Sequence, residues 1–109
     1  MVSQASLLLT LKAAPYEVMV TGEKKVEFRK VSKWMESRLF SKDGDRQYDR
    51  VVFVNGYGGD RPRFSTSFKG YKLVSGGVYK LYSNGLEVDT RGSPTYVILL
   101  GDDIIVEHT

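Results

Sequence analysis

The sequence contains no cysteine, one histidine and one tryptophan among its 109 residues. The absence of cysteine excludes a disulfide framework, thiolate metal ligands and a cysteine nucleophile. The single histidine, His108, is one residue from the end of the sequence, where the fixed position that a general base needs is not expected. We therefore expect no metal site and no cofactor.

Long apolar runs are missing as well. No stretch approaches the roughly 20 apolar residues of a membrane-spanning helix. The first residues also lack the basic region and apolar core of a secretion signal. We therefore expect a soluble, cytoplasmic protein without a membrane partner.

The composition is that of an ordinary globular domain, with 41% hydrophobic and 27% charged residues. A chain of 109 residues has room for one core, so we expect residues 1–109 to form a single domain. The net charge is +3, and residues 61–86 combine basic and aromatic side chains without an acidic residue. Such a mixture suits single-stranded RNA, although amphipathic strands with aromatic residues in the core explain most of it.

Hydrophobic periodicity predicts a mainly β, α+β domain. The run Leu7-Leu8-Leu9 is typical of a strand buried on both faces, and Asn84-Gly85 is a strong hairpin signal. Short helices are expected at residues 13–20 and about 32–40, and a surface loop at 41–49. Further strands are expected at residues 50–54, 63–74, 78–82, 86–88, 95–100 and 104–107, the last two as a hairpin around residues 101–103. About five to seven short strands with two short helices favour a sandwich or barrel.

The stretch from Thr21 to Lys30 is the strongest candidate for a site. Gly22 ends the first helix as a C-cap, because glycine adopts the left-handed conformation without a Cβ penalty. The apolar pattern then changes to period two, which places Glu27 and Arg29 on one face of a strand, about 7 Å apart. Lys24 lies in the bend before them. The three charges therefore converge, either in a polar pocket or as a surface ion pair.

The pattern Gly22-x-Lys24-x-x-Glu27-x-Arg29 resembles the G-x-K-x-x-E-x-R signature of the ASCH domains, small β-barrels of the PUA-like superfold. A strand and a helix before the motif, and the apolar residues 96–101 near the end, extend the likeness over most of the chain. The resemblance implies a PUA-like (ASCH) β-barrel. It also implies a ligand that is RNA or a modified nucleoside, which some members of the family hydrolyse.

The resemblance and the residue types together predict a binding pocket. Lys24 and Arg29 would hold a phosphate or a base carbonyl, Arg29 being the better bidentate donor. Glu27 would accept from a base amino group or orient the two cations. Trp34 either stacks on a base or belongs to the core or its rim. The other expected ligand-binding residues are Gly22, Tyr57, Arg61 and Arg63.

Two other functions remain open. In a hydrolase, either a ribonuclease or an acylated-nucleoside amidohydrolase, Glu27 would activate water and Lys24 would stabilise the oxyanion. Family members that look like amidohydrolases carry a threonine at the position of Glu27, and they use a second carboxylate with no counterpart identified here. In a protein-interaction domain, an aromatic-rich edge strand over residues 64–71 would permit dimerisation. The expected state is a monomer or weak dimer.

Overall fold

The computed structural model describes residues 5–56 and 61–107. In these ranges the chain forms two helices, α1 (Ala13–Val20) and α2 (Lys33–Leu39), and ten strands. The strands are β1 (Ser6–Leu11), β2 (Val26–Lys30), β3 (Phe40–Ser41), β4 (Gly44–Asp45), β5 (Arg50–Asn55), β6 (Arg63–Val74), β7 (Tyr79–Leu81), β8 (Glu87–Asp89), β9 (Thr95–Leu100) and β10 (Ile105–Glu107). The expected α+β, mainly β class is confirmed. Neither of these helices is long and apolar enough to cross a membrane.

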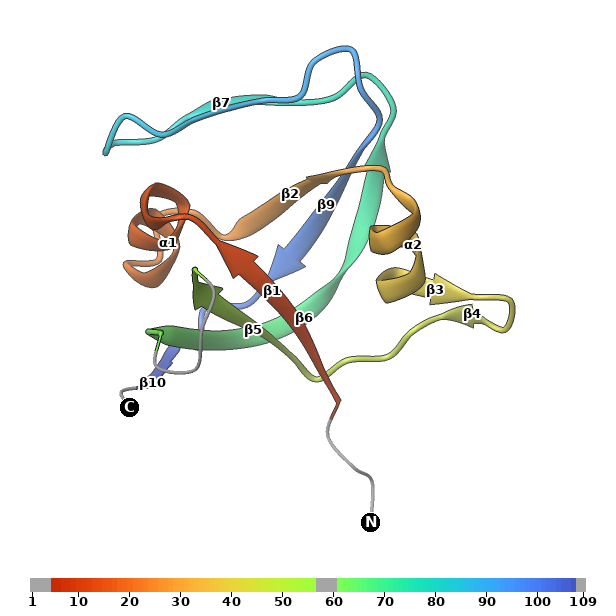
Figure 1. Cartoon of the computed structure of the whole chain (residues 1–109), viewed down its shortest axis with the longest axis horizontal. Coiled ribbons are helices and arrows are strands. Elements are labelled where there is room, and N and C mark those ends of the chain that lie inside the picture. The colour runs from red at the N-terminus through yellow and green to blue at the C-terminus, as the bar shows by residue number, and fades with distance from the viewer. Residues whose placement is uncertain (1–4, 57–60, 108–109) are drawn as a thin grey trace.

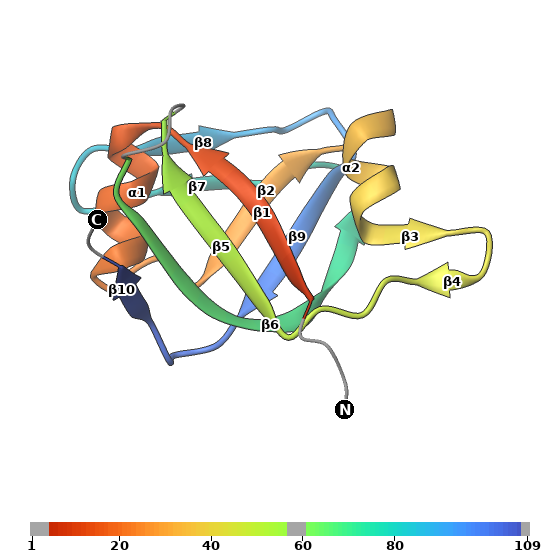
Figure 2. The same ribbon diagram turned by 60° about the horizontal axis from the view of Figure 1, so that its bottom comes forward.

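Six strands form one sheet in the order β1-β5-β6-β9-β2, with β10 paired to β6 beside this path (Figure 1). The β1–β5 pair is parallel and the other pairs are antiparallel. Figure 2 shows the sheet curling so that its two outer strands, β1 and β2, approach one another. No strand ladder joins β1 to β2 in the part of the chain that the structure describes. The expected barrel is therefore a curled sheet that strand pairing does not close.

The core lies inside this curl, against α1 and α2. The alternate leucines of β1, Leu7, Leu9 and Leu11, are buried with Phe53 of β5 and Phe64 of β6. The expectation that β1 is buried on both faces is wrong, because Leu8 is 57% exposed. Side chains alternate between the two faces of a strand, and Leu8 lies on the face opposite the three buried leucines.

The second helix begins as the sequence indicates. The Ser32 hydroxyl caps it by accepting from the Met35 N–H at 3.1 Å, and Met35 and Leu39 are buried. The segment expected as a plain loop, residues 41–49, contains the end of a short ribbon in which Phe40–Ser41 pairs with Gly44–Asp45. Gly44 has a φ of +114°, which favours glycine at this turn.

Strand β6 is the central strand of the sheet. Its first half pairs with β5 and β10, and its second half pairs with β9 after a register shift between Phe68 and Tyr71. The hypothesis of an aromatic-rich edge strand over residues 64–71 is therefore wrong. The outer strands of the main path are β1 and β2.

The expected hairpin between β9 and β10 is also wrong, since β10 pairs with β6. Asp103 explains the change of partner. Its carboxylate accepts from the Arg50 Nη1 at 2.7 Å, the Ser67 hydroxyl at 2.6 Å and the Ser67 N–H at 3.0 Å. These bonds fasten the segment after β9 to β6 and hold the pKa of the Asp103 carboxyl well below its usual range.

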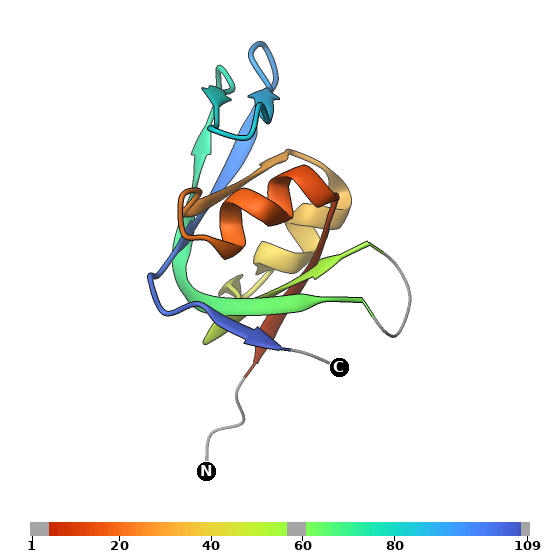
Figure 3. The ribbon, with the colours of Figure 1, turned by 90° about the vertical axis from the view of Figure 1, so that its left-hand side faces the viewer.

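The hairpin expected at Asn84-Gly85 is confirmed, but its loop has three residues and not two, because the Tyr82 N–H donates to the Leu86 carbonyl at 2.9 Å. Strands β7 and β8 form a two-stranded ribbon, and Gly85 has a φ of +86° at its tip. The ribbon with its tip, residues 79–89, is called the arm below. Figure 3 shows the arm standing away from the main sheet. In Figure 1 it runs along the side of the molecule that carries β2 and α1.

Candidate functional site

The motif begins where α1 ends. Gly22 has a φ of +88°, and its N–H donates to the Met19 carbonyl at 3.0 Å. The Lys24 N–H then donates to the Val18 carbonyl at 2.9 Å, which folds the turn back along the helix. As a result the Lys24 side chain enters the interior, and the residue is only 3% exposed.

The Lys24 ammonium has three acceptors. They are the Glu27 Oε1 at 2.8 Å, the Val26 carbonyl at 2.6 Å and the Met19 Sδ at 3.6 Å. Burial lowers the pKa of Lys24, and the charge and hydrogen bond of Glu27 act in the opposite direction. The Lys24–Glu27 pair is thus a buried ion pair and not a surface one.

Glu27 joins the lysine to Arg29. Its Oε2 accepts from the Arg29 Nε at 2.9 Å and lies 2.8 Å from Nη2. The same Nη2 donates to the Thr10 carbonyl on β1 at 2.9 Å. Arg29 therefore bridges the gap between β2 and β1 that no strand ladder closes. The sequence-based expectation that Lys24, Glu27 and Arg29 converge agrees with this geometry.

Arg29 also lines a groove of about 670 Å³. We call it the Arg29 groove; its walls are Ser6, Leu7, Leu8, Thr10, Arg29, Trp34, Arg38 and Tyr48. Trp34 is 48% exposed, and the Arg38 guanidinium lies 4.8 Å from the centre of its ring. The groove has two guanidinium groups and no carboxylate among its lining residues, so it is basic as well as aromatic.

A smaller cavity of about 190 Å³ adjoins the Arg29 groove, and Lys24, Glu27 and Arg29 all line it. The arm passes over this region. Tyr82 of the arm is buried, with its ring centre 6.0 Å from the Lys24 Nζ. Burial raises the pKa of the Tyr82 phenol to about 12. The arm therefore covers the buried lysine.

The tip of the arm is attached to the motif and to α1. The Ser83 hydroxyl and N–H donate to the Glu23 carboxylate, the N–H at 2.8 Å. These bonds lower the pKa of Glu23. The Asn84 amide donates to a backbone carbonyl of α1 at 3.0 Å. Residues 60 or more positions apart in the sequence are thereby joined beside the motif.

The other expected site residues lie in different places. Arg61 lines a depression of about 460 Å³ together with Asn55 and Gly56; no residue of the motif lines it, and it shares Thr10 with the Arg29 groove. Arg63 lies on β6 opposite Val54, and the structure does not bring it to the cavities that Arg29 lines. Gly22 lines a separate cavity, considered below. Tyr57 lies outside the described residues.

Sequence reasoning missed Arg38, Tyr48, Leu8 and Thr10 as groove residues. Arg38 could have been found, because it follows Trp34 by four positions on an expected helix and therefore shares its face. Thr10 contributes a backbone carbonyl, which no side-chain pattern reveals. Tyr48 reaches the groove from a segment expected to be a surface loop.

Searches of protein-family models, curated proteins and solved structures find no match to this chain. The resemblance to the ASCH domains therefore rests on the motif and on the order of the elements around it. Within residues 5–56 and 61–107, no group of three or more histidine, aspartate or glutamate side chains is placed to hold a metal ion.

Proposed function

We propose that the chain is an ASCH-type, PUA-like domain that binds RNA or a modified nucleoside in the Arg29 groove. The observation that carries this proposal is the way Arg29 is held. Glu27 and the Thr10 carbonyl fix its Nε and Nη2, whereas Nη1 has no hydrogen-bond partner among the described residues. A guanidinium that is already oriented can donate to a phosphate or a base carbonyl with little further ordering.

The neighbours of Arg29 support a nucleic-acid ligand. Trp34 offers a half-exposed ring on which an unpaired base can stack, and Tyr48 lies in the same groove. Arg38 adds a second positive charge beside the ring. Basic and stacking groups in one groove are the combination that single-stranded nucleic acid needs.

Binding is better supported than hydrolysis. A general base needs a free oxygen, but both carboxylate oxygens of Glu27 already accept from cationic side chains. Two N–H groups of Lys24 likewise donate to oxygens, and the third faces the Met19 sulfur and not the Arg29 groove. The hydroxyl groups of Ser65, Thr66 and Ser67 on β6 are bonded to Arg50, the Gly101 carbonyl and Asp103, and no bond joins them to Lys24 or Glu27 in the described residues.

Trp34 supplies the test, because it is the only tryptophan of the chain. We expect its fluorescence to be quenched in a saturable way by a single-stranded RNA of about eight nucleotides. The affinity should fall steeply with added salt, because phosphate contacts release counterions. An NMR titration with acetylated cytidine, followed over hours, tests the nucleoside ligand and would reveal acetate if the chain were a hydrolase.

Three variants test the groove with labelled RNA. Trp34→Leu should weaken binding by about 5- to 150-fold, which corresponds to the loss of one base stack. Arg38→Gln should reduce the salt slope by about 0.7 for one lost phosphate contact. Lys72→Gln on β6 is the control and should change neither value. Equal losses of RNA affinity in all three variants would contradict the proposal. So would the absence of both fluorescence quenching by RNA and NMR shifts with acetylated cytidine, which would favour a protein-interaction domain.

A further inference from the structure

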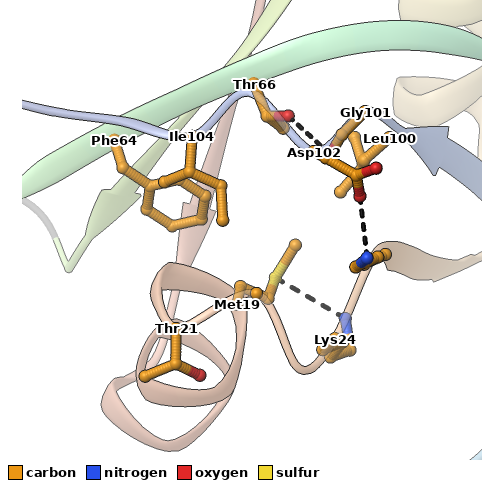
Figure 4. Close-up of a pocket in the computed structure, with 11 residues that line it drawn as sticks. Met19, Thr21, Lys24, Phe64, Thr66, Leu100, Gly101, Asp102 and Ile104 are labelled. Atoms are coloured by element: carbon orange, nitrogen blue, oxygen red, sulfur yellow. Dashed lines mark hydrogen bonds and ion pairs between the residues drawn. The ribbon is translucent and has the colours of Figure 1, made fainter.

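A second cavity lies on the other side of Lys24, between α1, β6 and the segment that links β9 to β10 (Figure 4). Its volume is about 250 Å³, and it shares no lining residue with the Arg29 groove. We call it the Met19 cavity. Its apolar lining residues are Met19, Phe64, Leu100 and Ile104. This volume is below the roughly 300–1,000 Å³ of sites for drug-sized ligands, so it suits a smaller molecule.

Five residues that line the Met19 cavity are polar: Thr21, Lys24, Lys25, Thr66 and Asp102. Thr66 lines it, but the Thr66 hydroxyl already donates to the Gly101 carbonyl at 2.9 Å. Lys25 and Asp102 also line it and form an ion pair of 2.8 Å, with both side chains largely exposed. Figure 4 shows Asp102 beside Leu100. The charges at the edge of the cavity therefore neutralise each other.

The group that distinguishes the cavity is the Lys24 ammonium. Two of its N–H groups donate to oxygens at 2.6 and 2.8 Å. The remaining acceptor is the Met19 Sδ at 3.6 Å, and both residues line the cavity (Figure 4). A thioether is a weak acceptor, and the Lys24 side chain is only 1% exposed to water. A buried cation thus has a poorly satisfied donor beside the apolar residues of the Met19 cavity.

We propose that the Met19 cavity binds a small neutral molecule that has a compact apolar body and one carbonyl oxygen. The carbonyl replaces the Met19 sulfur as the acceptor of the Lys24 N–H, so the Met19 side chain must turn aside, because Lys24 is only 1% exposed as the cavity stands. The apolar body contacts Phe64, Leu100 and Ile104. A carboxylate is disfavoured because Glu27 already balances the charge of Lys24, and the Lys25–Asp102 pair adds no net charge. The proposal does not depend on RNA binding, since the two sites have separate walls.

Three ring compounds of similar size test the ligand class: cyclopentanone, cyclopentane and cyclopentanecarboxylate. With the full chain as the sample, we expect cyclopentanone to cause saturable NMR shifts at Met19, Thr21, Thr66 and Ile104. It should bind at least about tenfold more tightly than either other compound, because only it offers a neutral acceptor to a charged donor. Equal affinity for cyclopentane, or no saturable shift, would overturn the proposal.

Two variants place the ligand. Ile104→Phe fills the cavity and should abolish the shifts, and unaltered far-UV circular dichroism would show that the fold is kept. Met19→Gln supplies an internal carbonyl to Lys24, so the preference for cyclopentanone over cyclopentane should disappear. If cyclopentanone binds Ile104→Phe as it binds the original chain, the ligand lies elsewhere and the proposal is wrong. The test with Ile104→Phe is decisive even if Met19→Gln does not fold.

Discussion

Glu27→Gln is the substitution whose effect follows most directly from the structure. Glutamine keeps the size of the side chain but removes the charge that balances Lys24, which is 3% exposed. It also turns an amide group toward the N–H groups of Arg29, where the carboxylate now accepts. The variant therefore leaves a buried ammonium without a counter-charge and places donors against donors.

The expected loss of stability is large. Removing one partner of a buried ion pair costs about 3–5 kcal/mol. For a domain of this size, about 4 °C of melting temperature is lost per kcal/mol, so we expect a decrease of roughly 12–20 °C. Asp102→Asn is the matched control, because it breaks an ion pair of the same 2.8 Å length whose two side chains are exposed. The control should change the melting temperature far less.

The pH dependence adds a second signature. Burial lowers the pKa of Lys24 in the folded chain, whereas an unfolded lysine titrates near its ordinary value of about 10.4. Between these two pKa values the unfolded state binds more protons, so the free energy of unfolding rises with pH. Loss of Glu27 lowers the folded pKa further, because the opposite charge that raises it is gone. The window in which stability rises is therefore wider in Glu27→Gln than in the original chain.

Thermal unfolding followed by circular dichroism at several pH values between 6 and about 10 measures both effects. The double variant Lys24→Met, Glu27→Gln should recover part of the lost stability, since no uncompensated ammonium remains. A melting temperature for Glu27→Gln close to that of Asp102→Asn would refute the buried pair. So would a variant whose stability does not rise with pH.

Three further predictions concern the arm and the turn that precedes it. Glu23→Gln should speed amide exchange at Ser83, because the Ser83 N–H donates to the Glu23 carboxylate. The fold lowers the pKa of Glu23, so in the original chain this carboxylate should stabilise the fold fully above the ordinary Glu pKa. That stabilisation should be lost as the pH falls through the folded pKa. Tyr82 should ionise near pH 12, which an absorbance step that is missing in Tyr82→Phe would show. The free energy of unfolding should fall as the pH rises from the ordinary tyrosine pKa of about 10 to the folded pKa of about 12. If the step that Tyr82→Phe removes lies near pH 10, Tyr82 is not buried. Gly77→Ala should lower the melting temperature, because Gly77 has a φ of +81° and an added Cβ would lie 2.0 Å from the Thr90 carbonyl oxygen, whereas Gly76→Ala, with open space around it, should have little effect.

The sequence was sufficient for the local geometry of the motif. Period two placed Glu27 and Arg29 on one face, and the bend after Gly22 brought Lys24 to them. Neither rule says which face of β2 meets the interior. That depends on the pairing of β2 with β9 and on the arm that brings Tyr82 over Lys24. Burial of the charges was therefore not predictable from the local pattern.

The errors in strand pairing have the same origin. A turn such as residues 101–103 favours pairing of the strands on either side of it. Asp103 overrides this preference through bonds to Arg50 and Ser67, which are distant in the sequence. Likewise Leu8 is exposed because its side chain lies on the face of β1 opposite the core, and the leucine run itself does not show that only one face is covered.

Side-chain bonds of Lys24, Glu27 and Arg29 join the outer strands β2 and β1, which no strand ladder joins in the described ranges. They connect the end of α1 to β2 and, through the Thr10 carbonyl, to β1. Loss of ligand binding in Lys24 or Glu27 variants would therefore not identify a catalytic residue, because the fold loses a connection at the same time. Trp34 and Arg38 are exposed and belong to no such connection between strands. Their variants separate ligand binding from folding, so the groove, and not the buried pair, is where function should be tested first.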